Sequence, residues 1–192
     1  MATWAELQAD VVTWTNRPTL VAETQLALRN AIRTAHRQGK FWRDLTTVPV
    51  TLVANQVQTL ILTDTCPRMR QLAYVKDIAH DGYLEEAQIL DLLDSDGFPK
   101  NDVYWGIGDN LNIRSAYGST SYEIAYYRQP VTTPPESIED WLLRDYFDVV
   151  VLLAAASVLG SVGEQEIKSR VDALLLVAMA DMVSDQLEVT GR

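Results

Sequence analysis

The side chains best suited to chemistry near neutral pH are two histidines and one cysteine. His36 and His80 have no partner residue at the spacing that metal ligands require. His36 stands among basic residues of an expected helix, and we predict a surface position for it. Cys66 precedes a proline and has no nearby histidine that could activate its thiol. The sequence therefore predicts neither a metal site nor a catalytic cysteine.

An aspartate-rich stretch has the centre of a calcium-binding loop but not its ends. Asp94, Asp96 and Gly97 match the middle of such a loop. Its first and twelfth positions would be Leu92 and Val103, where carboxylates are needed. We therefore predict a turn here.

Glycine and nucleophile motifs are also incomplete. Gly106 and Gly108 are followed by Leu111, where a dinucleotide-binding fingerprint needs its third glycine. Neither a P-loop nor a nucleophile elbow is present. We therefore expect no catalytic residue, no cofactor and no metal, and predict that the protein is not an enzyme. A catalytic site assembled across the fold needs no local motif, so that alternative stays open.

Four cations share one side of an expected helix. Arg29, Arg33, Arg37 and Lys40 are spaced by four, four and three residues, so they line one stripe. The stripe is either a solvated helix face paired with acidic neighbours, or a docking surface for an acidic partner or phosphate. These four residues are the candidate contact residues.

Composition limits the class of protein. A length of 192 residues and a hydrophobic fraction of 47% suit one folded domain, or one domain with an insertion. The net charge of -10 predicts a poor general DNA binder, because Lys and Arg supply the affinity for phosphate. The single Cys66 excludes an internal disulfide, and the N-terminus does not have the pattern of a signal peptide. We expect no membrane span.

Four long helices are expected to position these residues. A capping box at Thr3–Glu6 opens the first, which ends near Trp14, and the second runs from about Pro18 to Gln38. The stretch 133–188 predicts two antiparallel helices, because an apolar run at 149–159 precedes two glycines and a second helical pattern.

Capping boxes are predicted for both helices of this hairpin, at Thr133–Glu136 and at Ser161–Glu164. The last helix is expected to turn one apolar face inward, formed by Ile167, Val171, Leu174, Leu175, Ala178 and Met182. The hairpin is either the core of one domain or, because one small domain cannot cover it on all sides, partly an interface with another subunit.

The middle of the chain, 45–130, is rich in alternating Val, Thr, Ile and Tyr. Its first part predicts two strands joined by a turn at Ala54–Gln56, and 84–93 fits either a strand or a short helix. Further strands are expected at 69–78, 103–107, 111–115 and 122–128. The sequence thus predicts an α+β fold, mainly helical. A four-helix bundle-like core of 1–44 and 131–192 carries a β-rich insertion, 45–130, between the second and third long helices.

The order of elements, with scattered residues, resembles the head-to-tail connector proteins of tailed bacteriophages. The residues are T-W-A-E-L near the start, H-R-Q-G-K-F-W-R-D-L, D-V-Y-W-G-I-G-D-N-L-N-I-R, Y-Y-R-Q-P and W-L-L followed by A-A-A-S-V-L-G. The resemblance covers nearly the whole chain. More narrowly, the chain resembles the adaptor proteins of short-tailed phages, the tail tubular protein A family.

The resemblance implies a structural virion protein of the neck, assembled in the host cytoplasm. Such proteins form a dodecameric ring below the portal protein, extend the DNA channel, and dock the tail tube or nozzle. DNA passes through without specific binding. The family often has an extended C-terminal arm, and only about Val189 to Arg192 are expected to follow the last helix here. The cationic stripe is then a candidate contact with the portal or a neighbouring subunit.

Two other classes of protein stay open besides the phage adaptor and an enzyme with a site assembled across the fold. One is another neck protein, such as a stopper or tail-completion protein. The other is a non-viral helical module for oligomerisation or ligand binding, which stoichiometry would distinguish from a ring.

Overall fold

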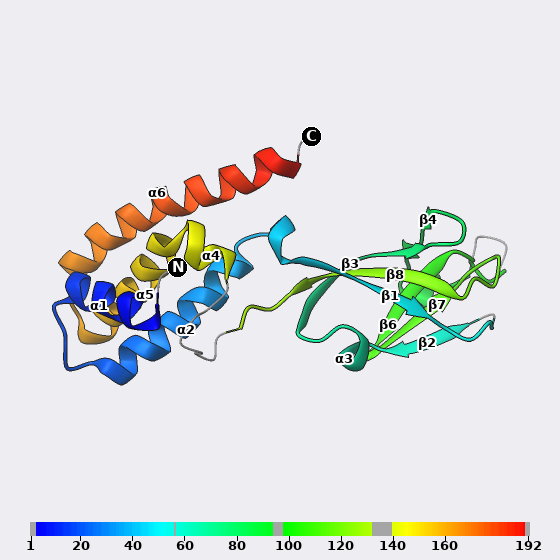
Figure 1. Ribbon diagram of the computed structural model, residues 1–192, viewed down its shortest axis with the longest axis horizontal. Coiled ribbons are helices and arrows are strands. Elements are labelled where there is room, and N and C mark those ends of the chain that lie inside the picture. The colour runs from blue at the N-terminus through cyan, green and yellow to red at the C-terminus, as the bar shows by residue number, and fades with distance from the viewer. Residues whose placement is uncertain (1–2, 56, 94–97, 132–139, 191–192) are drawn as a thin grey trace. The chain divides into compact units, whose positions relative to one another are not determined.

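The computed structural model describes residues 3–55, 57–93, 98–131 and 140–190, with side chains through residue 185. Within these residues the protein is mixed α+β, 48% helical and 26% strand, with six helices and two sheets (Figure 1). The chain divides into two compact units. We call Met1–Arg43 with Pro130–Arg192 the helical unit, and Asp44–Gln129 the strand unit.

One apolar helix lies at the centre of the helical unit. This helix, α5 (Phe147–Val162), has nine buried residues and is apolar on all sides. A helix of that kind is stable only when other elements surround it. Four helices pack against it: α1 (Trp4–Thr15), α2 (Val21–Arg37), α4 (Trp141–Asp145) and α6 (Gln165–Thr190).

Of the predicted capping boxes, one is present in the structure and another is not. The box at Thr3 is confirmed, because Thr3 Oγ1 accepts from the Glu6 N–H at 3.2 Å and the Glu6 carboxylate accepts from the Thr3 N–H at 2.6 Å. The box at Ser161 is wrong. Ser161 lies inside α5 and its hydroxyl donates to the Val158 carbonyl at 2.7 Å, while Gly163 ends the helix in the left-handed conformation.

Helix α4 starts at Trp141 and helix α2 at Val21. The expected box at 133–136 lies outside the described residues, and α4 is instead capped by Asp140, whose carboxylate accepts from the Leu142 N–H at 2.9 Å. The second helix begins at Val21 rather than Pro18, because residues 18 and 19 form a turn.

The expected inward face of α6 is only partly correct. Val171 and Met182 are buried against α5, but Ile167 and Leu174 are exposed. α6 packs mainly on α5. It has apolar residues on several sides, and this single partner covers only a narrow strip of them. The helix itself continues to Thr190, the last residue that the structure describes.

The strand unit contains two four-stranded sheets around one core. The first sheet has the order β1-β8-β3-β4 and the second β2-β7-β6-β5. All pairs are antiparallel except β5–β6. The elements are β1 (Leu45–Thr51), β2 (Gln58–Ile61), α3 (Leu62–Thr65), β3 (Met69–Asp77), β4 (Gly82–Tyr83), β5 (Glu85–Glu86), β6 (Val103–Ile107), β7 (Asn110–Arg114) and β8 (Ser121–Arg128), with 3-10 turns at Trp42–Asp44 and Ile89–Asp91.

The expected hairpin at the start of this unit is wrong in its pairing. Strands form on both sides of the predicted turn, but β1 pairs with β8 and β2 pairs with β7, in different sheets. The two strands lie in different sheets because both sheets pack on one core. One sheet contributes Leu60 and Ile113 to this core, and the other contributes Val75 and Ile124. The segment between β1 and β2 therefore crosses from sheet to sheet.

Candidate assembly surface

The cationic stripe lies on the outer side of α2. Arg33 and Arg37 are exposed on this helix, whereas Arg29 is half-buried and its Nε has no hydrogen-bond partner among the described residues. Lys40 is exposed but lies beyond the end of α2, after the C-cap at Gln38. The structure thus places three of the four candidate residues on one helix, and the fourth on the loop that follows.

The opposite side of α2 explains why these cations face solvent. Leu28, Ala31, Ile32 and Ala35 recur at helical spacing and are buried in the core of the helical unit. Five of the exposed positions of α2 form a second row at alternating spacings of three and four residues. We define this row, Glu23, Leu26, Asn30, Arg33 and Arg37, as the α2 outer face. It is acidic at its N-terminal end and basic at its C-terminal end.

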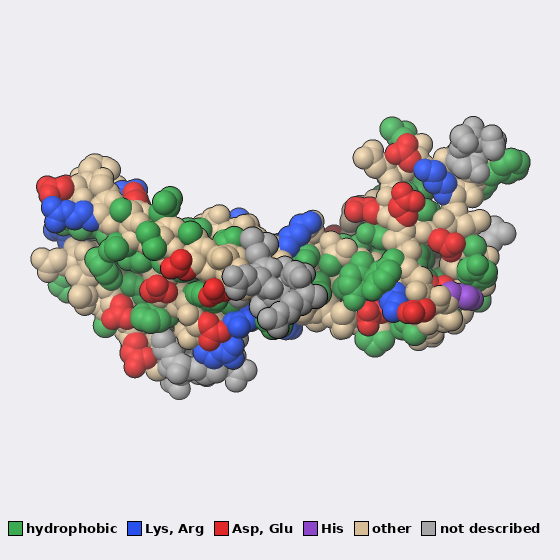
Figure 2. Space-filling view, turned by 90° about the horizontal axis from the view of Figure 1, so that it is seen from above, with side chains coloured by type: hydrophobic (Ala, Val, Ile, Leu, Met, Phe, Trp, Pro, Cys, Tyr) green, Lys and Arg blue, Asp and Glu red, His purple; other side chains and the backbone are tan. Residues whose placement is uncertain are grey.

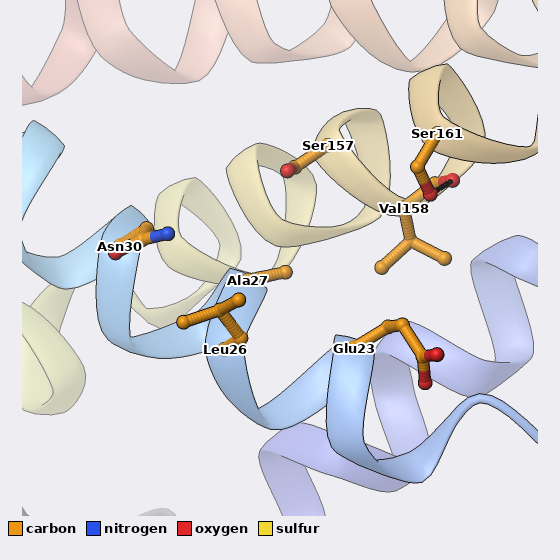
Figure 3. A pocket seen from close by; sticks show the side chains of 7 residues that line it. All are labelled: Glu23, Leu26, Ala27, Asn30, Ser157, Val158 and Ser161. Atoms are coloured by element: carbon orange, nitrogen blue, oxygen red, sulfur yellow. Dashed lines mark hydrogen bonds between the residues drawn. The ribbon is translucent and has the colours of Figure 1, made fainter.

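A groove runs beside the α2 outer face, between α2 and α5. It has a volume of about 160 Å³, and Figure 3 shows the side chains that line it. Ala27 and Val158 give it an apolar floor, while Ser157 and Ser161 place hydroxyls on the α5 side. Small-molecule pockets usually measure about 300–1,000 Å³. This groove therefore suits one inserted side chain better than a cofactor.

The outward side of α6 is a second exposed surface of the same unit. Leu174, Leu176 and Val177 are 47%, 75% and 60% exposed. Figure 2 views the side of the unit on which α6 lies, and hydrophobic side chains reach the surface there among charged ones. We define the α6 outer face by its exposed residues Arg170, Ala173, Leu174, Leu176, Val177, Ala180 and Asp181. Contiguous apolar surface of this kind commonly marks an interaction site.

His36 is buried, which corrects its expected surface position. It is 2% exposed, and its Nε2 lies 3.0 and 3.2 Å from the two carboxylate oxygens of Asp140. A carboxylate can only accept here, so the imidazole nitrogen donates. Trp141 meets the imidazole edge-on at 5.3 Å. The pair joins the end of α2 to the start of α4, and no sequence signal links residues 104 positions apart.

A second ion-paired cluster fixes the other end of α4. Asp145 accepts from the guanidinium groups of Arg144 and Arg43. These hydrogen bonds, from Arg144 first and Arg43 second, lower the pKa of Asp145 to about 2. The Arg43 guanidinium also lies 5.5 Å from the ring centre of Trp141. The segment that follows α2 is therefore held to α4 by charge as well as by packing.

The strand unit contains a cavity of about 300 Å³ next to a Ser–His–Asp cluster. The Ser119 hydroxyl lies 2.5 Å from Asp77 Oδ2 and 2.9 Å from His80 Nδ1. The same Nδ1 lies 3.0 Å from Asp77 Oδ2. A catalytic base needs its nucleophile and its orienting carboxylate on different ring nitrogens. Here both use Nδ1, so the three groups do not form a nucleophile–base couple.

The hydrogen bonds of this cluster instead tie two loops together. Burial acts to raise the pKa of Asp77, but hydrogen bonds from Ser119, from the His80 ring and from the N–H groups of Ala79 and His80 outweigh it and lower that pKa below its usual value. His80 also stacks on Tyr117, with ring centres 4.2 Å apart. The cluster thus joins the loop after β3 to the loop before β8.

Other expectations about chemistry concern single residues. Cys66 is buried, and its burial raises the pKa of the thiol, which makes it a poor nucleophile. Among the described residues, no three His, Cys, Asp or Glu side chains are grouped so as to hold a metal ion. In the same part of the chain, no helix combines the length and apolarity that crossing a bilayer would need.

The geometry therefore singles out the α2 outer face, its groove and the α6 outer face, all in the helical unit. Comparison of the chain with protein-family models and with curated proteins gives no match in either case.

Proposed function

We propose that this chain is a structural head-to-tail adaptor of a bacteriophage virion. In this proposal it forms a ring below the portal protein, extends the DNA channel and docks the tail, without catalysing a reaction. The observation that carries the proposal is the α6 outer face, an apolar surface left open on a helical unit whose own core is already filled. The resemblance in element order supplies the class of assembly.

In such a ring the two units of the chain would make different contacts. We infer that α1, α2, α5 and α6 act as a four-helix bundle-like core, and that Asp44–Gln129 is an insertion carried by it. In the proposal the helical units pack side by side through the α2 outer face and the α6 outer face. The strand unit then supplies contacts to the tail or to a neighbour.

The charge balance fits a channel protein. With a net charge of -10, the chain offers DNA few counterion-releasing contacts overall. A channel wall of that kind lets DNA slide, whereas a cationic wall would hold it. The cations of the α2 outer face then serve protein contacts, with the portal or with a neighbouring chain.

The test is the native mass of the chain alone and mixed with a portal protein from the same genome. A closed ring in either sample is the expected result. Charge reversal of Arg33 and Arg37 to Glu should weaken ring assembly or portal docking. If both processes were unchanged, the cationic residues would have no part in the contact.

One observation favours a second function, a helical dimerisation module. On α6 the residues Arg170, Leu174, Val177 and Asp181 follow one another at spacings of four, three and four. In an antiparallel pair of α6 helices, Leu174 would meet Val177 and Arg170 would meet Asp181 of the other copy. A stable dimer that ignores the portal would support this function and contradict the adaptor.

A further inference from the structure

The cavity of about 300 Å³ in the strand unit has a lining that suits a cation. It brings together two carboxylates, Asp77 and Asp102, with the rings of His80, Tyr83 and Tyr117. Of the described residues that line it, none is a lysine or an arginine. A concave surface lined by one sign of charge concentrates ligands of the opposite sign. The lining therefore favours a positively charged ligand over an anion.

The buried carboxylate of this cavity is fixed in place and charged. Asp77 is 4% exposed, and its oxygens accept hydrogen bonds from the Ser119 hydroxyl, the His80 ring and two backbone N–H groups. Burial acts to raise its pKa, but these hydrogen bonds outweigh burial and lower the pKa below its usual value. They also use the acceptor positions of both oxygens. Asp77 therefore contributes negative charge to the cavity and not a direct contact with a ligand.

The second carboxylate is available for direct contact. Asp102 is exposed, and its Oδ1 accepts from the Ala116 N–H at 2.9 Å, which holds the side chain in position. Its Oδ2 has no hydrogen-bond partner among the described residues. The N–H groups of a cation form strong charge-assisted hydrogen bonds with a carboxylate oxygen of this kind. Asp102 is therefore the residue of the cavity that would bind a cation directly.

Aromatic rings supply the other contact that organic cations prefer. The His80 ring stacks on Tyr117, with ring centres 4.2 Å apart and planes inclined by 22°, and Tyr83 adds a third ring to the lining. Tyr117 and Tyr83 are 69% and 65% exposed, so a ligand can reach them. Cations bind over the faces of such rings, and a planar guanidinium group also stacks on them. A planar cation therefore fits this lining better than a compact ammonium group.

Other ligand classes fit the cavity less well. A metal ion needs several ligands at once, and no three His, Cys, Asp or Glu side chains of the described residues are grouped to hold one. An anion would meet two like charges, which costs binding energy. Lys76 lies near the cavity, with Nζ 5.6 Å from the centre of the Tyr83 ring, but its ammonium group is paired with Asp81. The charge of Lys76 is therefore already balanced outside the lining.

We propose that this cavity binds a guanidinium group, which Asp102 holds by charge-assisted hydrogen bonds and Tyr83 and Tyr117 hold by cation–π contact. The group belongs either to a free small molecule of the size of arginine or to an arginine side chain of another protein. The cavity lies at the lower end of the size range of small-molecule pockets, which suits a ligand this small. The inference goes beyond the adaptor proposal and does not depend on ring formation.

Isothermal titration calorimetry at low ionic strength tests the class of ligand. The probe is Nα-acetyl-arginine amide, and its matched control is Nα-acetyl-citrulline amide, which has the same shape without the charge. The arginine probe should bind about tenfold more tightly than the citrulline compound and than the corresponding lysine amide. Equal binding of the citrulline compound would overturn a cation site. Equal binding of the lysine compound would overturn the assignment to guanidinium.

Variants of the chain test the position of the site. Asp102→Asn removes the charge but keeps an oxygen for the Ala116 N–H, and asparagine tolerates the φ of 56° at this position. This variant should weaken binding of the arginine probe by about tenfold. Tyr117→Ala should weaken it by about fivefold. Asp109→Asn, an equal change of charge on an exposed residue between β6 and β7, is the control and should leave the affinity unchanged.

Free arginine distinguishes the two sources of the group. Tighter binding of free arginine than of the capped amide supports the site and assigns it to a small molecule, whereas tighter binding of the amide supports it and assigns it to a protein side chain. Binding of neither, or equal affinity of the parent chain and Asp102→Asn, would overturn the site. A ring that forms while no probe binds would overturn the site alone, and binding to a chain that forms no ring would overturn the adaptor alone.

Discussion

Removing the Asp140 side chain should destabilise the helical unit by an amount that can be worked out from its contacts. The carboxylate caps α4 by accepting from the Leu142 N–H, and it accepts from the buried His36 ring. Loss of such a cap costs about 0.5–2 kcal/mol. Leaving a buried donor without its partner costs about 1–3 kcal/mol. For Asp140→Ala we therefore expect a loss of about 2–4 kcal/mol in the free energy of unfolding.

Tryptophan fluorescence during urea unfolding is the assay, because Trp141 lies against both His36 and Phe41 and reports on this region. Asp140→Asn is the matched control. Asparagine is as good a helix cap as aspartate, so this variant should lose less than half as much stability. In a double-mutant cycle, His36→Ala and Asp140→Ala should couple by about 1 kcal/mol or more.

A loss below about 0.5 kcal/mol for Asp140→Ala would refute this reasoning, since surface changes without such contacts fall in that range. Equal losses in the alanine and asparagine variants would show that the cap contributes little. Additive effects in the cycle would mean that the pairing of His36 with Asp140 contributes no stability.

Two further predictions concern single residues of the helical unit. The pKa of Asp145 is about 2, below its ordinary value of 3.8, because it accepts hydrogen bonds from Arg144 and Arg43, so its stabilising contribution is present above pH 3.8 and is lost as the pH falls towards 2. Asp145→Asn should flatten the pH dependence of the free energy of unfolding, measured by urea denaturation between pH 5 and 2. The change should be less than about 1 kcal/mol, because the pair is partly exposed. An unchanged pH dependence in the variant would contradict the pairing. Gly163 has φ of 79°, so Gly163→Ala should lower stability by about 1–2 kcal/mol, whereas Gly160→Ala, inside α5 and near only the flexible end of Lys168, should be neutral or stabilising. Equal melting temperatures for the two alanine variants would contradict the predicted cost of a side chain at the positive φ of Gly163.

Local patterns predicted elements well where one physical constraint decided the outcome. The apolar run at 149–159 could only be a surrounded helix, and α5 is one. The capping box at Thr3 formed because its two hydrogen bonds need only four consecutive residues. Alternation in 122–128 gave β8 because the buried Tyr122, Ile124 and Tyr126 share the inner face of one strand.

Pairing between distant segments could not be predicted in the same way. Two strands flank residues 54–56, yet each pairs with a strand more than 45 residues away along the chain, because the two sheets share one core. The burial of His36 depends on Asp140, which the sequence does not mark as its partner. The Ser161 hydroxyl had a carbonyl acceptor within its own helix, so the predicted capping box did not form.

The candidate surface shows the same limit. Spacing placed Arg29, Arg33 and Arg37 on one helix, but only the fold shows that Arg29 is half-buried and that Lys40 lies past the helix end. Helical periodicity also assigned Leu174 to the inside of α6. Which side of an all-round apolar helix stays open depends on how many neighbours pack against it, and α6 packs mainly on α5.

The native mass of the protein, measured alone and then with a portal protein from the same genome, tests the central claim most directly. The adaptor proposal predicts a closed ring in at least one of the two samples. A stable dimer, unchanged in mass when the portal is added, would contradict it.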